Sequence, residues 1–290
     1  MDVYQLELDK GYIVRNSKGN LVAHNFKSEK DLLGNKDIEH DETGWEIIPE
    51  NTVCIGRGAN GRRSHIYQRM LEQEGVTIHN SIKCHDYCND KWYTYHTLEN
   101  AKVRQPRTAL ITTPDLLDVP LKQMGGKYPM ILKTAYGTHG VGVVLISHFS
   151  QLLSTTQLLK KMDDDQVLLL QEYIKTDYDV RVMYFNGEIV GQLKRPVIDN
   201  DFRSNISQGN EPEEIEITEL EKQACIRAAE AVDGYWVGVD FIPSKNREKE
   251  PPYIIEVNGS PGTGYINEKN NMNIYKMILE SYKNRDNWKI

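Results

Sequence analysis

The sequence lacks the features that mark membrane, secreted or nucleic-acid-binding proteins. No apolar run approaches the length of a membrane span, and the N-terminal residues do not have the layout of a signal peptide. Lys and Arg (35) are outnumbered by Asp and Glu (42), and the resulting formal charge of −7 argues against binding to phosphate backbones. We therefore expect a cytoplasmic protein with neither a nucleic acid nor a membrane as its partner.

Cysteine is scarce, with four in 290 residues. Their positions, 54, 84, 88 and 225, give no disulfide framework for a chain of this size, so we expect reduced thiols. Zinc is an alternative at Cys84, His85 and Cys88 with His79 nearby, although the two cysteines are not separated by the standard two residues.

What is present is typical of a globular enzyme. Apolar residues make up 39% and charged residues 27%, and the length suffices for two or three compact units. Strand-like and helix-like segments alternate along the chain, which predicts the α/β class.

An acid-bearing strand is predicted over residues 253–258. Because side chains alternate across a strand, Glu256 and Asn258 should share one face, with Ile255 and Val257 on the core side. In the preceding strand, 235–242, Asp240 should lie opposite an apolar face.

Three oxygen-bearing side chains can then meet on one surface: Asp240, Glu256 and Asn258. Hard oxygen ligands suit magnesium, which proteins usually hold through one or two carboxylates plus substrate phosphates. The alternative is a pair of ordinary half-buried strands with solvent-facing acids.

A lysine and a glycine-rich loop lie upstream. The strand 128–133 delivers Lys133 into a loop that contains Gly137 and Gly140, and a second apolar strand follows at 143–146. Glycines let backbone amides approach phosphate oxygens, and the lysine adds a positive charge there. The order of residues is not that of a Walker P-loop, and a purely structural hairpin is the alternative.

A hairpin leads from this region to a polar loop. Strands predicted over 179–185 and 188–193 are joined by Asn186-Gly187, a strong signal for a type I′ turn. The loop beyond them carries Arg203 and Asn205. Such groups are usually solvated, but beside a metal–phosphate site they can hold developing negative charge.

Taken in order, these motifs resemble a known family. The lysine and glycine-rich loop, Q-E-Y-I at 171–174, D-V-R at 179–181, D-F-R-S-N at 201–205, G-V-D at 238–240 and E-V-N-G-S-P-G at 256–262 are similar to the ATP-grasp carboxylate–amine ligases, and among them to the RimK-type glutamate ligases. The resemblance runs from Cys88 to the C-terminus, with a departure at Gly259, where these ligases more often have alanine.

The resemblance implies an ATP-grasp fold of α+β lobes with a small α/β N-terminal domain. We expect the N-terminal part over 1–90, the central lobe over 91–170 and the C-terminal lobe over 171–290.

The resemblance also implies a role for each group of site residues. Two lysines would contact the ATP phosphates, residues 172–174 would form the strand that reads adenine, and Asp179 would lie near the ribose. The nucleotide-binding residues would be Lys91, Lys133, Gly137, Gly140, Gln171, Glu172, Tyr173, Ile174, Asp179 and Arg181. Magnesium, or manganese in its place, would be held by Asp240, Glu256 and Asn258, and catalysis would rest on Arg203 with Asn205.

The implied reaction uses ATP to convert a carboxylate, a poor acyl donor, into an acyl phosphate that an amine attacks. Positioning and charge neutralisation dominate such phosphoryl transfer. The expected substrate is an amino acid or a peptide or protein terminus, and a homo-oligomer is compatible with the sequence. The main alternative is an idle ATP-binding regulatory module.

The N-terminal part is harder to interpret. Residues 52–79 predict a strand, a helix and a strand, with G-x-G-x-x-G at 56–61. This pattern raises a dinucleotide-dependent oxidoreductase as a rival, but the acid expected after the second strand is replaced by His79 and Asn80. Arginines in this region would either bind a carboxylate-bearing substrate or form a solvated loop: Arg57, Arg62 and Arg63.

Overall fold

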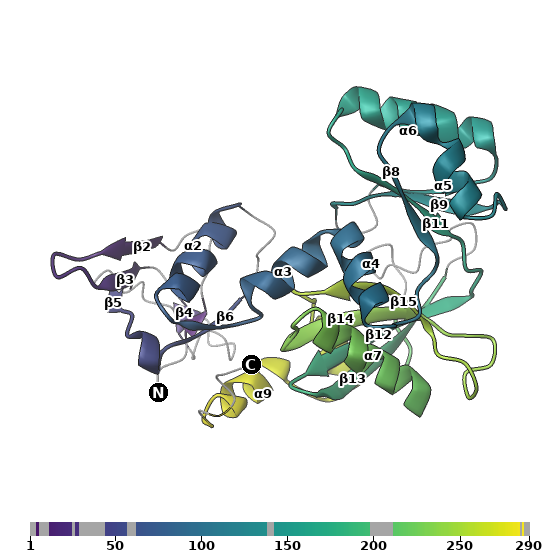
Figure 1. Cartoon of the computed structure of the whole chain (residues 1–290). Coiled ribbons are helices and arrows are strands. Elements are labelled where there is room, and N and C mark those ends of the chain that lie inside the picture. Colours follow the sequence, from purple (N-terminus) through teal and green to yellow (C-terminus); the bar gives the residue numbers. More distant parts are fainter. Residues whose placement is uncertain are drawn as a thin grey trace. The chain divides into compact units, whose positions relative to one another are not determined.

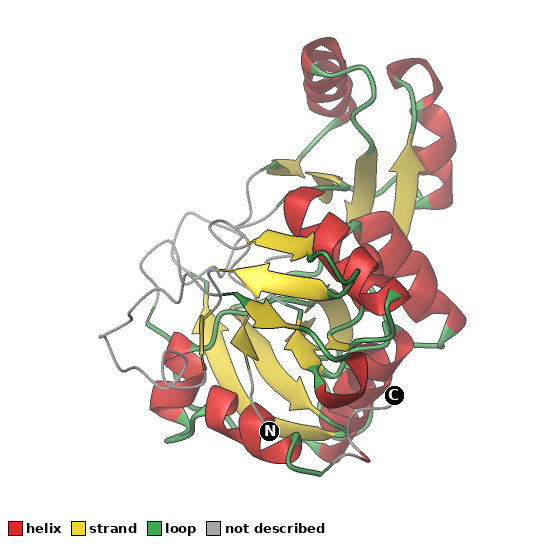
Figure 2. Cartoon of the chain, turned by 90° about the vertical axis from the view of Figure 1, so that its left-hand side faces the viewer, coloured by secondary structure: helices red, strands yellow, loops and turns green. Residues whose placement is uncertain are grey.

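The computed structural model describes residues 4–5, 12–24, 27–28, 44–56, 62–137, 142–197, 211–284 and 286. Helices and strands are interspersed throughout these residues (Figure 2). The chain forms two compact units, the first made of Met1–His85, Asp233–Val237 and Gly259–Ile290 and the second of Asp86–Val232 and Gly238–Asn258. The C-terminal segment Gly259–Ile290 thus belongs to the first unit. None of the helices that the structure describes is long and apolar enough to cross a membrane.

The first unit contains two sheets. One has the order β4 (Lys27–Ser28), β1 (Tyr4–Gln5), β6 (Val53–Ile55), β7 (Thr77–His79). The parallel pair β6 and β7 is connected by α2 (Arg62–Gln73), which confirms the strand–helix–strand unit predicted from the sequence. The other sheet is formed by β2 (Tyr12–Arg15), β3 (Leu21–His24) and β5 (Trp45–Glu46). Helices α8 (Gly264–Lys269) and α9 (Ile274–Ser281) also lie in this unit, and α3 (Ile82–Asn89) leads out of it.

The end of β7 is occupied by internal contacts. The Asn80 amide is fully buried, donates to the carbonyls of Trp236 and Gly259, and accepts from the backbone amides of Tyr235 and Trp236. His79 stacks on Tyr235 and lies 2.9 Å from the Tyr282 hydroxyl. A dinucleotide-binding fold needs an acid at this position. Here His79 and Asn80 instead connect β7 to the segments 233–237 and 259–290 of the first unit.

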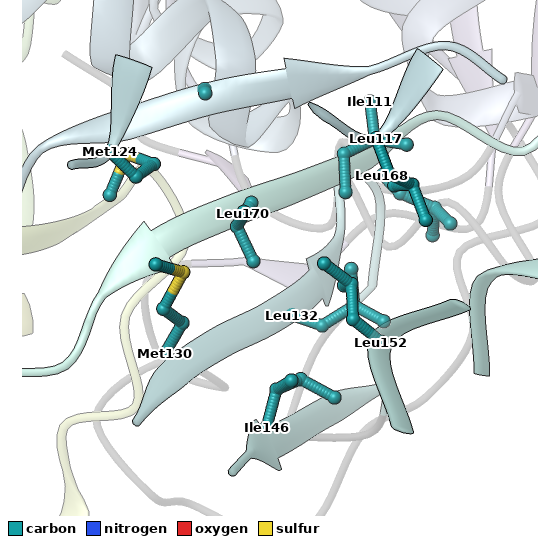
Figure 3. Close-up of a cluster of buried hydrophobic side chains, with 10 residues drawn as sticks. Ile111, Leu117, Met124, Met130, Leu132, Ile146, Leu152, Leu168 and Leu170 are labelled. Carbon is teal, nitrogen blue, oxygen red and sulfur yellow. The ribbon is translucent and has the colours of Figure 1, made fainter. Parts of the chain in front are cut away.

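The second unit begins with a four-stranded antiparallel sheet in the order β10 (Val143–Ile146), β9 (Met130–Thr134), β11 (Leu168–Glu172), β8 (Thr108–Ile111). Short α5 (Asp118–Gln123) and longer α6 (Phe149–Met162) pack on one face (Figure 1). Between them lies a core of buried side chains from the strands and helices, including Leu132, Leu152, Leu168 and Leu170 (Figure 3). Burial of these apolar side chains is the main stabilising contribution here.

A second sheet of this unit has the order β13 (Glu188–Pro196), β12 (Tyr178–Phe185), β14 (Trp236–Ile242), β15 (Tyr253–Asn258). Helices α4 (Lys91–Asn100) and α7 (Glu219–Ala231) lie beside it (Figure 1). A capping box formed by Thr218 and Glu221 opens α7. The predicted type I′ turn is also confirmed, since Asn186 and Gly187 have φ of 45° and 95° between β12 and β13.

Two local expectations differ from the structure. The strand β11 ends at Glu172, so Tyr173 and Ile174 lie beyond it. In β15 a register shift opposite Asp240 and Phe241 interrupts the alternation, and Ile254 rather than Ile255 is buried with Val257.

Candidate nucleotide-binding site

A cavity in the second unit is lined by α4, β8, β9, β11 and β15. Four polar side chains expected in the nucleotide or metal site line it: Lys91, Lys133, Gln171 and Glu256. Apolar walls come from Leu98, Leu169, Ile254 and Ile255. An apolar cavity with a few convergent charged groups is the usual form of a small-molecule site.

Lys133 is the most buried cation of this cavity, with 9% of its surface exposed. Strand β9 carries it inward, and its ammonium donates to the Gln171 side-chain oxygen at 3.0 Å. Burial lowers the pKa of Lys133 to about 8, helped by the nearby charge of Lys91 and opposed by Glu256. A desolvated ammonium of this kind gains strongly from an anionic ligand.

Lys91 approaches the same cavity from the first turn of α4. Asp90 caps this helix by accepting from the backbone amides of Trp92 and Tyr93. The Lys91 ammonium donates to the carbonyl of Gly137 at 2.7 Å, at the start of the glycine-rich loop. Its pKa is lowered by burial, an effect that Glu256 and Asp90 partly offset. Two lysines from distant parts of the sequence therefore face one pocket, which the carboxylate of Glu256 also lines.

The acid-bearing strands lie side by side, with Asp240 directly opposite Glu256 and Asn258 opposite Gly238. Directly opposed residues project from the same face of a sheet, and so do residues two apart. Glu256 is exposed, whereas Asp240 is only 2% exposed. The register thus brings the three oxygen-bearing side chains to one face, and Asp240 is not the solvent-facing acid of the alternative interpretation.

Asp240 belongs to a buried network of charges. Arg181 donates to both of its carboxylate oxygens at 2.5 and 2.6 Å, and Arg195 donates to one of them at 2.8 Å. Arg195 also donates hydrogen bonds to both carboxylate oxygens of Asp179, at 2.6 and 2.8 Å. Burial alone would raise the pKa of Asp240, but the two arginines outweigh it and lower that pKa.

In this network, two residues expected to contact the nucleotide form ion pairs with other side chains. Asp179, expected near the ribose, is buried against Arg195, and Arg181 is committed to Asp240. Arg195 was missed at the sequence level, although it lies directly opposite Asp179 in the β12–β13 hairpin. Regular pairing outward from the Asn186-Gly187 turn would place Lys194 opposite Asp179. A register shift between Met183 and Tyr184 moves the pairing by one residue, so Arg195 lies there instead.

The residues present fit a magnesium ion. Asp240, Glu256 and Asn258 offer two carboxylates and an amide oxygen on one face. A carboxylate has about four lone-pair directions, and three of those of Asp240 accept hydrogen bonds from arginines. One lone-pair direction of Asp240 is therefore left for a metal ion. Among the described residues, no group of three or more His, Cys, Asp or Glu side chains is arranged to hold a metal ion. The residues around Cys84 therefore do not form the zinc site considered as an alternative. All four cysteines are free thiols.

Glu172 is the last residue of β11 and directly follows Gln171, which lines the cavity. Arg107 donates to its carboxylate at 3.1 Å, and the backbone amide of Glu172 donates to the carbonyl of Arg107. The remaining expected site residues lie outside what the structure describes: Gly140, Arg203, Asn205 and Arg57. Arg62 and Arg63 open α2, but their side chains are not described.

Comparisons with known proteins identify the fold. The structure is similar to D-alanine–D-alanine ligase from Bacillus anthracis in complex with ATP, with a TM-score of 0.61, 20% identity, and coverage of 79% of this chain and 76% of that one. It is also similar to the ATP-grasp ligase PsnB in complex with a precursor variant, Mg and ADP, with a TM-score of 0.64, 17% identity, and coverage of 97% and 87%. The fold is therefore that of the ATP-grasp ligases, as expected.

Sequence relatives of the chain include proteins named as glutamate ligases. A probable alpha-L-glutamate ligase of Pseudoalteromonas atlantica is 30% identical over 73% of this chain and 69% of its own length. The coenzyme gamma-F420-2:alpha-L-glutamate ligase of Methanocaldococcus jannaschii is 28% identical over 85% of this chain and 79% of its own.

The model of the RimK-like ATP-grasp domain matches residues 88–282, and the chain belongs to that family. The predicted class, an ATP-dependent carboxylate–amine ligase, is confirmed, and the dinucleotide-dependent oxidoreductase is set aside.

Proposed function

We propose that this ligase binds ATP with magnesium in the cavity of the second unit and forms an acyl phosphate from a carboxylate. The amine of an amino acid or of a peptide terminus then displaces phosphate, and the products are an amide, ADP and phosphate. The observation that carries this proposal is the convergence of Lys91, Lys133 and Glu256 on one cavity within the family's domain.

Each group has a physical task in this reaction. Lys91 and Lys133 would neutralise phosphate oxygens, since both ammonium groups are desolvated and gain from an anion. Magnesium would be held by Asp240, Glu256 and Asn258 together with phosphate oxygens, and it would stabilise the charge of the transferred phosphoryl group.

Arg203 and Asn205 keep the role predicted from the sequence, the stabilisation of charge that develops during transfer. A group that acts mainly in the transition state adds little to ground-state affinity. Arg203→Ala should therefore lower turnover by about two to three orders of magnitude, the scale of one lost oxyanion donor, with a much smaller change in ATP affinity.

The relatives suggest where to look for substrates. Several curated relatives are named alpha-L-glutamate ligases, and PsnB is described in complex with a precursor peptide. We propose L-glutamate as the first amine to test, with small molecules and peptides that carry a free carboxylate as the acyl donors.

The test is ADP release from the full chain with ATP, magnesium, L-glutamate and a panel of carboxylates. We expect steady-state release, over many turnovers, that requires both a carboxylate and an amine and that Glu256→Gln abolishes. Thr156→Val, in α6 outside the cavity lining, serves as the control and should leave the rate unchanged. ATP binding with no ADP release for any pair would favour the idle regulatory module, and wild-type release by Glu256→Gln would remove the metal assignment.

A further inference from the structure

A chain of hydrogen bonds runs from Lys133 to the backbone across the floor of the cavity. The Lys133 ammonium donates to the Gln171 side-chain oxygen at 3.0 Å, and the Gln171 amide nitrogen donates to the Thr108 hydroxyl at 2.8 Å. The Thr108 hydroxyl donates in turn to the carbonyl of Pro106 at 3.0 Å. Thr108, Gln171 and Lys133 all line the cavity.

The chemistry of these groups fixes the direction of every bond. An ammonium can only donate, so the oxygen of the Gln171 amide must face Lys133 and the nitrogen must face Thr108. A proline carbonyl can only accept, so the Thr108 proton is committed to Pro106 and the hydroxyl oxygen is left to accept from Gln171. The reversed orientation of the amide would oppose a donor to the ammonium.

The strands hold this chain in place. Thr108 in β8 lies directly opposite Gln171 in β11, and Lys133 in β9 lies opposite Leu169, two residues from Gln171 on the same face. Three adjacent strands therefore contribute one side chain each. Lysine has a flexible stem with many rotamers, so a fixed acceptor can decide where its ammonium lies.

We propose that Thr108 is a positioning residue for nucleotide binding, which orients the Gln171 amide so that its oxygen holds the Lys133 ammonium toward the ATP phosphates. This role rests on the proposed contact between Lys133 and the phosphates. It assigns Gln171 to Lys133 rather than to the nucleotide itself, and it gives a function to a threonine that touches no reacting group.

The decisive variant is Thr108→Val, which keeps the shape of the side chain and removes the hydroxyl. Affinity for ATP should fall by about tenfold, because the Gln171 oxygen is then no longer held against Lys133 and the hydrogen bond that places the charged ammonium is lost. Affinity for adenosine, which has no phosphate, should change by less than about twofold because Lys133 does not contact it. Titration calorimetry with each ligand measures the two values on the full chain in the presence of magnesium.

Three further variants separate positioning from a general effect on the fold. Thr108→Ser restores the hydroxyl and should restore ATP affinity. Thr156→Val makes the same threonine-to-valine change at a buried position in α6 beyond the cavity lining, and it should change neither affinity. Gln171→Met removes the acceptor directly and should reproduce the loss for ATP alone, so the proposal can be tested even if Thr108→Val does not fold.

A double-mutant cycle with Lys133→Met completes the test. If Thr108 acts through Lys133, Thr108→Val should change ATP affinity by less than about twofold once Lys133 is absent. Equal losses for ATP and adenosine, multiplicative effects in the cycle, or failure of Thr108→Ser to restore affinity would overturn the positioning role. Unchanged ATP affinity in Lys133→Met alone would instead overturn the proposed phosphate contact, so the two failures are distinguishable.

Discussion

Replacement of Asp240 by asparagine separates the structural role of this acid from its proposed metal role. The carboxylate accepts three charge-assisted hydrogen bonds, two from Arg181 and one from Arg195. In Asp240→Asn an NH₂ group replaces one carboxylate oxygen, so a donor faces the guanidinium donors. The buried negative charge is lost as well. Removal of one partner of a buried ion pair costs about 3–5 kcal/mol.

The surroundings favour the lower end of this range. Arg195 keeps its pair with Asp179, and the side chain of Arg181 is 18% exposed, so water compensates part of its charge. We therefore expect Asp240→Asn to lower the free energy of unfolding by about 3 kcal/mol. Glu256→Gln is the matched control, because its carboxylate is exposed, and it should change that free energy by less than about 0.5 kcal/mol.

Urea unfolding without nucleotide or metal measures both variants. The pKa of Asp240 is lowered in the folded protein, so its contribution is fully present above the usual carboxyl pKa of about 4 and is lost as the pH falls below it. The wild type should therefore lose more stability than Asp240→Asn between about pH 5 and pH 3. A loss below about 1 kcal/mol for Asp240→Asn at neutral pH, or an equal loss for Glu256→Gln, would refute the buried network.

Three further expectations concern single residues. ATP affinity should fall as the pH rises through about 8, the lowered pKa of Lys133, because binding favours the charged ammonium; calorimetry across this range should show a flatter profile for Lys133→Met. Asn80→Ala should destabilise the first unit by about 2–4 kcal/mol, since its amide makes four buried hydrogen bonds to backbone, and unchanged urea unfolding would contradict this. Thr156→Val should raise the free energy of unfolding by about 1 kcal/mol, because the buried hydroxyl has no hydrogen-bond partner among the described residues; a lower unfolding midpoint would contradict this.

Much of the second unit could be predicted because its signals are local. The strand ending near Lys133, the Asn186-Gly187 turn and the capping box of Thr218 each depend on a few neighbouring residues, and the structure has all three. The motifs in their order also indicated the family.

The parts that could not be predicted depend on register and on long-range contacts. A shift of one residue at Met183 places Arg195 rather than Lys194 opposite Asp179, and no turn signal marks it. A similar shift beside Asp240 buries Ile254 in place of Ile255. The association of Gly259–Ile290 with the N-terminal residues is tertiary, so local patterns along the chain do not contain it.

The most direct test of the central claim follows an oxygen atom. If the carboxylate substrate is labelled with ¹⁸O and incubated with the protein, ATP, magnesium and an amine, an acyl phosphate pathway transfers one labelled oxygen to the released phosphate. Mass spectrometry of both products should then show an amide that keeps one labelled oxygen, with a mass equal to the labelled acid plus the amine less one H₂¹⁸O, together with singly labelled phosphate in equal amount. Amide formation with unlabelled phosphate, or ADP release without an amide, would contradict ligation through an acyl phosphate.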